Sequence, residues 1–332
     1  MVETGPRNLI TDIAGLLVGN AEDLGLGTGV TVIRVETPTA AAVDVRGGGP
    51  GTRETDLLEP ENLVEHIDAL ALSGGSAFGL SAATGVQTWL REQNRGFAVA
   101  GVRVPIVPAA ILFDLSRGIG WRGEPPYPAL GYRAVASASE EFALGSVGAG
   151  TGATTFDLKG GLGSASEVAP SGFMVAALAA VNAVGTATVG DGPHFRAAPF
   201  EIGEEFGGLD LPHPWPAEAR VLRHKAGLAQ NTTLAVVATD AALTRAMAKR
   251  LAMAAHDGLA RALYPVHTPF DGDLVFALAT GDRPLSDPPR DLSEIGAVAA
   301  NCLARAIARG IYEATSIATS DKPAWRDRFG KP

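Results

Sequence analysis

The sequence predicts an α/β fold in which mixed β-sheets pack as a sandwich with helices outside. Segments of strand composition alternate with helical ones, and strands also follow one another directly, as at residues 29–45. Hydrophobic residues make up 46% of the 332 residues and charged residues 19%, so the chain can build a large buried core. This length allows one large domain or two ordinary ones.

The individual elements follow from apolar runs and their spacing. Runs of branched or small apolar residues predict strands at 29–35, 39–45, 66–71, 106–115, 173–181, 234–238 and 274–279. Helical composition and spacing predict helices at 79–93, 132–142, 241–263 and 293–315. Residues 191–226 are polar and punctuated by proline, which indicates a surface excursion where a chain can be cut without unfolding its core.

Three glycine-rich stretches interrupt these elements. Residues 46–52 either bring backbone amides to a ligand or form a tight crossover between strands, and the crossover is favoured. Residues 72–80 lack the spacings of phosphate-binding loops, so we expect their small residues to let a helix pack closely. The stretch 148–155 is followed by Lys159, which is either a solvated loop lysine or a cationic site group.

Bulk properties exclude several classes of protein. The net charge of −9 and the lack of a basic patch argue against nucleic-acid binding. The longest apolar stretch, 173–181, is too short to span a bilayer, and residues 1–6 lack the features of a signal peptide. Cys302 is the single cysteine, so no intrachain disulfide is possible. We expect a cytoplasmic protein without a membrane partner.

No metal or cofactor is expected. The six histidines show no ligand spacing, HExxH is absent, and the Asp-Gly-Asp at 271–273 lacks the other ligands of a calcium loop. No Gly-x-Ser-x-Gly is present, which argues against an α/β-hydrolase.

The stretch around Asn231 and Thr232 carries the main functional hypothesis. If the peptide bond between them breaks, Thr232 becomes an N-terminal residue that holds both a nucleophile, its Oγ, and a base, its α-amine. An unperturbed α-amine has a pKa of about 8, close enough to neutrality to accept a proton from a hydroxyl. Asn-Thr-Thr is common by chance, so this interpretation needs support from elsewhere.

Other polar residues at strand ends are candidates for the same site. Asn182 ends a buried strand, and its amide is either hydrogen-bonded structurally or aimed at a reacting oxyanion. Asp271 and Asp273 flank a glycine at a strand start and could orient an ammonium or a hydroxyl. Asp114 could be catalytic, but a lone aspartate at a strand end more often caps or pairs locally, and the local role is favoured.

Taken together, these residues resemble the L-aminopeptidase/D-amidase–esterase family, which includes β-aminopeptidases and the nylon-oligomer (6-aminohexanoate-oligomer) endohydrolase. Matching blocks occur in one order over nearly the whole chain, at residues 8–12, 72–80, 111–115, 148–153, 159–163, 181–185, 231–234 and 270–273. The resemblance implies a four-layer αββα sandwich that looks like the N-terminal-nucleophile hydrolases but has its own strand connectivity. It also implies a single domain, self-cleaved into residues 1–231 and 232–332, and a homotetramer or larger assembly.

Site roles follow from the same resemblance. Thr232 matches the nucleophile, Asn182 the asparagine that stabilises the oxyanion, and Asp271 and Asp273 the pair that orients the nucleophile and the substrate amine. A threonine with two aspartates is closer to the nylon-oligomer branch than to members with Gly-Ser at the scission site. Lys159 is a candidate for that branch's lysine, although this chain is shorter between Thr154 and Lys159. Two substrate-binding candidates for the oxyanion-hole tyrosine are Tyr127 and Tyr132.

The expected activity is hydrolysis of linear amides through a covalent ester, without a cofactor. Substrates would be small molecules such as 6-aminohexanoate oligomers, or peptides cut at the amino terminus. The alternatives are an aminopeptidase or β-aminopeptidase proper, an acyltransferase of the ornithine acetyltransferase type, and a non-enzymatic scaffold.

Overall fold

A computed structural model describes residues 2–115, 120–223, 225 and 231–330. Its strands are β1 (Leu16–Asp23), β2 (Thr28–Val45), β3 (Thr52–Arg53), β4 (His66–Ser73), β5 (Phe97–Val99), β6 (Val102–Val104), β7 (Ala109–Ile111), β8 (Leu162–Val168), β9 (Met174–Asn182), β10 (Thr232–Ala241) and β11 (Leu274–Arg283). The helices are α1 (Ala82–Glu92), α2 (Tyr127–Ala136), α3 (Arg245–Ala262), α4 (Pro288–Tyr312) and α5 (Trp325–Phe329), and short 3-10 turns join several of these elements.

The strands form one long mixed sheet. Within the described residues its order is β3-β7-β4-β2-β11-β10-β9-β8, with β1 paired to β2, and β5 and β6 make a separate hairpin. The pair β10 and β11 is parallel, whereas β9 runs antiparallel to β10. The beginnings of β10 and β11 and the end of β9 therefore meet at one edge.

The long strand β2 divides the sheet into two halves. Its first part pairs with β1 and β4, its second part pairs with β11, and the register against β4 shifts between Arg34 and Thr39. The halves face each other across an apolar cluster to which both contribute, for example Leu70 and Ile33 from one half and Leu234 and Phe276 from the other. Each half is thus buried on its inner face.

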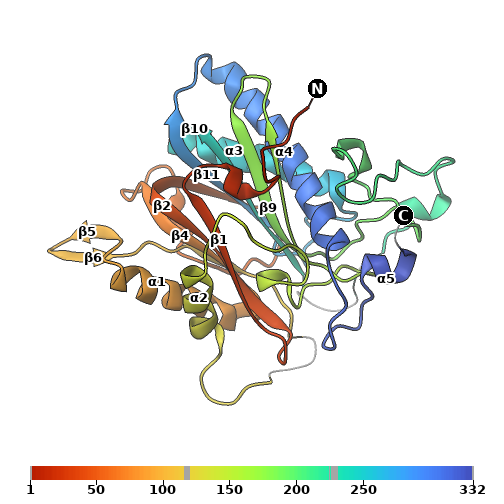
Figure 1. Ribbon diagram of the computed structural model, residues 1–332, viewed down its shortest axis with the longest axis horizontal. Coiled ribbons are helices and arrows are strands. Elements are labelled where there is room, and N and C mark those ends of the chain that lie inside the picture. The colour runs from red at the N-terminus through yellow and green to blue at the C-terminus, as the bar shows by residue number, and fades with distance from the viewer. Residues whose placement is uncertain (1, 116–119, 224, 226–230, 331–332) are drawn as a thin grey trace.

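Helices cover the two outer faces. Residues of β10 alternate, so that Val236 lies in the central cluster while Val237 packs in a second cluster with α3 and α4. A third cluster joins β2 and β4 to α1 and α2 (Figure 1). The predicted α/β fold, a four-layer αββα sandwich, is confirmed; its two sheets are halves of one continuous sheet.

Several boundaries differ from the sequence prediction. The strand predicted at 106–115 has only Ala109–Ile111 in regular pairing. Ile106, Pro108 and Leu112 still hydrogen-bond to β4, but Pro108 has no amide hydrogen to donate to a ladder. The helix predicted at 132–142 begins earlier, at Tyr127, and ends at Ala136, since Pro128 near its first turn starts a helix instead of preventing one.

Strand β8 was missed because its sequence, Leu-Gly-Ser-Ala-Ser-Glu-Val, has little branched or aromatic character. Packing against α4 explains why the residues of β8 are small. A Cβ added at Gly163 would overlap the backbone of α4 at Ala306, so the helix crosses the strand at nearly backbone-to-backbone distance.

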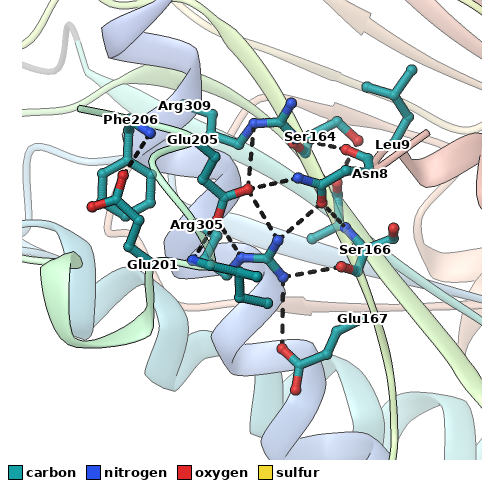
Figure 2. A network of polar contacts seen from close by, with 12 residues as sticks. Asn8, Leu9, Ser164, Ser166, Glu167, Glu201, Glu205, Phe206, Arg305 and Arg309 are labelled. Atoms are coloured by element: carbon teal, nitrogen blue, oxygen red, sulfur yellow. Dashed lines mark hydrogen bonds and ion pairs between the residues drawn. The ribbon is translucent and has the colours of Figure 1, made fainter. Parts of the chain in front are cut away.

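The excursion at 191–223 is tied to the core by a buried polar network (Figure 2). Glu205 accepts two hydrogen bonds from Arg305 of α4, Nε to Oε1 at 2.5 Å and Nη2 to Oε2 at 3.0 Å. Arg305 is fully buried and also donates to Asn8 Oδ1 at 2.9 Å and to the Ser166 carbonyl at 3.0 Å. The network therefore joins the N-terminal segment, β8, the excursion and α4.

No helix in the described part of the chain is long and apolar enough to cross a membrane.

Candidate active site

The predicted nucleophile lies where three strand ends meet. Thr232 is the first residue of β10 and is paired with Asn182, the last residue of β9. On the other side, Asn231 forms a parallel bridge with Asp271, just before β11 begins. The structure thus brings together four of the residues singled out in the sequence, and all are nearly inaccessible to solvent.

The peptide bond between Asn231 and Thr232 is surrounded by hydrogen-bond donors. The carbonyl oxygen of Asn231 accepts from the Thr232 hydroxyl at 2.6 Å and from the backbone amide of Gly272 at 2.8 Å. A donor on a carbonyl oxygen polarises it and stabilises negative charge that develops there. The hydroxyl and the carbonyl are therefore placed for chemistry on this bond.

The side chain of Asn231 is buried without compensation. Neither its Oδ1 nor its Nδ2 has a hydrogen-bond partner in the described structure. Burying an unsatisfied polar group costs free energy, so the uncut chain is destabilised locally at this bond.

Asp273 holds the backbone immediately after the nucleophile. Its Oδ1 accepts from the amide of Thr233 at 2.8 Å, and its Oδ2 accepts from the amide of His267 at 3.2 Å and from that imidazole's Nδ1 at 3.0 Å. The carboxylate therefore fixes the start of β10 relative to the loop that precedes β11.

Asp271 is engaged within the same loop. Its Oδ2 accepts from the amide and the hydroxyl of Thr268 at 2.9 and 2.8 Å, and its Oδ1 accepts from the amide of Val184 at 3.3 Å. Burial, and then repulsion by the Asp273 carboxylate, raise the pKa of Asp271 to about 6. Asp271 therefore takes up a proton as the pH falls through about 6.

Asn182 links β9 to the glycine-rich loop after residue 148. Its Oδ1 accepts from the amide of Thr154 at 3.0 Å and from the ammonium of Lys225 at 3.3 Å, and its Nδ2 donates to the Phe113 carbonyl at 3.0 Å. These bonds hold the Asn182 side chain between the end of β9, the loop at Thr154 and the Phe113 carbonyl.

The first glycine cluster is packed against the site loop. The amides of Arg46 and Gly47 donate to the Asp273 carbonyl at 3.0 Å each, and the amide of Gly49 donates to the Asp271 carbonyl at 2.8 Å. A Cβ at Gly47 would overlap the backbone of that loop. The cluster is the tight crossover that was favoured, and its amides bind the loop.

Lys159 is buried beneath the second glycine-rich loop. Its ammonium donates to the carbonyls of Gly150, Ala153 and Gly160 at 2.9, 2.7 and 3.0 Å. Burial lowers the pKa of Lys159 to about 7, and the Asp114 charge opposes that shift. All three ammonium hydrogens are used on backbone, so this arrangement holds the loop that carries Thr154.

The two tyrosine candidates occupy different environments. Tyr127 is fully buried against Gly75 and stacks edge-on with Trp121, with ring centroids 5.7 Å apart. Tyr132 lies on the exposed side of α2, and its hydroxyl donates to Glu92 of α1 at 2.7 Å. No observed contact connects Tyr132 with Thr232.

The model of peptidase family S58 matches residues 8–324. The chain belongs to peptidase family S58. An uncharacterized aminopeptidase of Mycobacterium tuberculosis (strain ATCC 25618 / H37Rv) is 44% identical over 97% of this chain and 98% of its own length.

Other proteins similar to this chain have names that state an activity. The 6-aminohexanoate-oligomer endohydrolase of Kocuria sp. (strain KY2) is 28% identical over 86% of this chain and 79% of its own. A solved Burkholderia sp. beta-aminopeptidase matches with a TM-score of 0.71 at 24% identity, over 95% of this chain and 89% of that one.

The L-aminopeptidase D-Ala-esterase/amidase of Ochrobactrum anthropi, described as a variant of the Ntn hydrolase fold, matches with a TM-score of 0.69 at 21% identity, over 99% of this chain and 91% of that one. The S58 chain therefore has this fold variant, and it is a hydrolase acting on amide bonds, as predicted.

Sequence reasoning does not find three residues at or next to this site. Lys225 donates to the Thr154 carbonyl at 2.5 Å as well as to Asn182. Burial, and then the Lys322 charge, lower the pKa of Lys225 to about 7. His267 contacts Asp273, and His256 contacts the other side of the His267 ring. No spacing rule points to these residues, since their roles depend on which loops the fold brings together.

Among the residues that the structure describes, no group of three or more His, Cys, Asp or Glu side chains could hold a metal ion.

Proposed function

We propose that this S58 chain cuts its own peptide bond between Asn231 and Thr232, and that Thr232 then serves as the N-terminal nucleophile of an amide hydrolase. The observation that carries the proposal is the carbonyl oxygen of Asn231, which accepts hydrogen bonds from both the Thr232 hydroxyl and the Gly272 amide. The products would be one chain of residues 1–231 and one of residues 232–332, folded as a single domain.

Self-cleavage would begin with attack of Thr232 Oγ on the carbonyl carbon of Asn231. The C–N bond breaks, the nitrogen becomes the α-amine of Thr232, and the acyl group is held as an ester. Water then hydrolyses the ester to leave a carboxylate at Asn231. The Gly272 amide stabilises the oxyanion formed in the first step, a contribution of about 3 kcal/mol for a well-placed donor.

The new α-amine would lie among acceptors. Oδ1 of Asp271 and Oδ1 of Asp273 each accept one hydrogen bond in the described structure, and a carboxylate oxygen can accept two. We assign these two acids to orienting the α-amine, which takes the proton from Oγ when Thr232 attacks a substrate. Asn182 is assigned to the substrate oxyanion.

Lys159 is proposed to act through the loop it holds. Its three backbone bonds set the position of the loop whose Thr154 amide binds Asn182. Tyr127 remains a candidate for the substrate side, whereas the position of Tyr132 gives it no part in the proposal.

The proposed substrates are small linear amides or peptides that carry a free amine. The acidic pair favours an ammonium near the nucleophile, and the names of the Kocuria and Burkholderia relatives point to ω-amino-acid oligomers and β-peptides. Assays of 6-aminohexanoate oligomers beside α- and β-amino-acid amides would rank these classes. Transfer of the acyl group to added ornithine would favour the acyltransferase alternative, and a homotetrameric, cytoplasmic enzyme remains a prediction.

Substitutions at two neighbouring threonines test the proposal. Thr232→Val keeps the shape of the side chain but removes the hydroxyl, so we expect an uncut and inactive chain, whereas Thr232→Ser should still be cut. Thr233→Val is the matched control, because Thr233 is equally buried and its hydroxyl has no partner in the described structure. A cut Thr232→Val protein, or an uncut Thr233→Val protein, would contradict the assignment.

A further inference from the structure

Behind Asp273 lies a row of hydrogen-bonded side chains that ends at β2. His267 Nδ1 lies 3.0 Å from Asp273 Oδ2, and His267 Nε2 lies 3.2 Å from His256 Nδ1. His256 Nε2 in turn lies 3.1 Å from the carbonyl oxygen of Asp44 and 3.3 Å from its carboxylate. The row therefore starts next to the nucleophile strand and ends at two acceptor oxygens on β2.

The three contacts require a definite number of protons. The carbonyl of Asp44 can only accept, so His256 must carry its hydrogen on Nε2. Nδ1 of a neutral His256 must then accept, which obliges Nε2 of His267 to donate. Nδ1 of His267 must also donate if Asp273 is ionised.

His256 is the neutral member of the pair. It is almost completely buried, and burial, opposed by the hydrogen bond to the Asp44 backbone, lowers the pKa of His256 to about 4. The extra proton therefore belongs to the His267–Asp273 end of the row, at the 3.0 Å contact between His267 Nδ1 and Asp273 Oδ2.

We propose that His267 and His256 are positioning residues for the nucleophile. They form a two-histidine relay that holds Asp273 in place under one condition. The two imidazoles and the Asp273 carboxyl group must together carry one proton more than two neutral imidazoles and an ionised carboxylate. This inference rests on the proposed function, since Asp273 acts there through the Thr233 amide and the Thr232 α-amine. Loss of the extra proton leaves one of the three contacts without a hydrogen and frees the Asp273 carboxylate to shift.

The charged groups around the relay come from three elements. Asp44 and Arg46 face His256 from β2 and the segment after it, and the Arg46 guanidinium is itself bonded to the Asp44 carboxylate at 3.0 Å. Asp273 faces the relay from the loop before β11, with Asp271 beside Asp273, and α3 contributes His256 itself. Since Arg46 opposes a cation at His256, the proton is kept at the Asp273 end.

The backbone at His267 suggests a conservative variant. His267 has φ +56°, a conformation that asparagine tolerates better than most residues. The amide of His267→Asn can donate to Asp273 in place of Nδ1 but does not titrate, whereas His267→Ala removes the donor. We expect His267→Asn to keep self-cleavage near the wild-type rate at neutral pH and to lose less rate than wild type as the pH rises. His267→Ala should be slowed about 100-fold, the effect of small misplacement of a reacting group.

Imidazole nitrogen NMR of the uncut Thr232→Val protein tests the relay without any catalysis. With ¹⁵N-labelled histidine at neutral pH, we expect both nitrogens of His267 to be protonated and His256 to be protonated at Nε2 alone, with signals assigned by the His267→Asn and His256→Gln variants. Two neutral imidazoles beside an ionised Asp273 carboxylate, identified by its ¹³C carboxyl shift, would overturn the inference. Equal cleavage rates in His267→Asn and His267→Ala at all pH values would also overturn it. If wild-type protein never cleaves, the proposed function fails, and the NMR result still decides the protonation of the relay.

Discussion

The backbone amide of Gly272 donates a 2.8 Å hydrogen bond to the carbonyl oxygen of Asn231, the group that self-cleavage would attack. Gly272 comes close to the nucleophile as well, because a Cβ built on it would lie 2.5 Å from Thr232 Oγ1. A glycine at this position therefore leaves room for the hydroxyl while its amide polarises the carbonyl.

Gly272→Ala should slow self-cleavage by about 100-fold or more, since the added methyl group displaces Oγ and loosens the donor on the oxyanion. The fraction of cut chain against time, on a denaturing gel, measures the effect. Gly192→Ala is the matched control, because its Cβ would meet nothing nearer than 3.5 Å. Processing of Gly272→Ala at the control rate would remove this amide from the mechanism.

Asp271→Asn should change how stability depends on pH. The folded-state pKa of Asp271 is about 6, raised by burial and by Asp273 from the ordinary value of 3.8. An ionised Asp271 therefore costs stability above about pH 6, and this cost disappears as the pH falls and the folded protein takes up the proton first. Relative to wild type, the free energy of unfolding of the variant should rise by about 2 kcal/mol between pH 4 and pH 8. Urea unfolding of both proteins in the Thr232→Val background measures this, and parallel curves would refute it.

His256→Gln should remove a loss of stability that the wild-type protein undergoes in acid. Burial lowers the folded-state pKa of His256 to about 4 from the ordinary value of 6.5. The unfolded chain therefore binds a proton first as the pH falls from 6.5 towards 4, and the wild-type protein loses about 3 kcal/mol over that window. The glutamine variant lacks this loss, so the two unfolding free energies should converge in acid. A constant difference from pH 7 to pH 4 would show that His256 is not held neutral.

Arg305→Met should destabilise the protein by about 3 kcal/mol, because it removes both Arg305 hydrogen bonds from the buried Glu205 carboxylate and leaves Arg309, at 3.7 Å, as its remaining cation (Figure 2). Since Glu205 and Arg305 lie on opposite sides of the proposed cut, the cut variant should also separate into its two chains at lower urea than wild type. Size-exclusion chromatography in urea measures the separation. Arg290→Ala, which removes only the exposed pair with Glu294, is the control and should cost no more than about 1 kcal/mol.

Much of the fold could be predicted because its central strands are strongly apolar. The runs at 173–181, 234–238 and 274–279 correspond to β9, β10 and β11, which carry the site at their ends. Strand β8 could not be found in this way, because its residues are small to let α4 approach closely, and small residues have low strand propensity.

The site could be predicted only as far as family resemblance reaches. Asn182, Thr232, Asp271 and Asp273 were named from the sequence, and the fold brings them together. The spacing of His256 and His267 fits no metal motif, yet the two side chains meet because the chain turns after α3. Lys159 stays a predicted site residue, and the three carbonyls that its ammonium binds are an arrangement that no sequence pattern reveals.

Intact mass under denaturing conditions, followed by N-terminal sequencing of the smaller fragment, tests the central claim most directly. Freshly purified wild-type protein should give two masses, those of residues 1–231 and 232–332, and the smaller fragment should begin Thr-Thr-Leu-Ala. A single mass for all 332 residues in active protein, or a fragment that begins at any other residue, would contradict the assignment of Thr232 as the nucleophile.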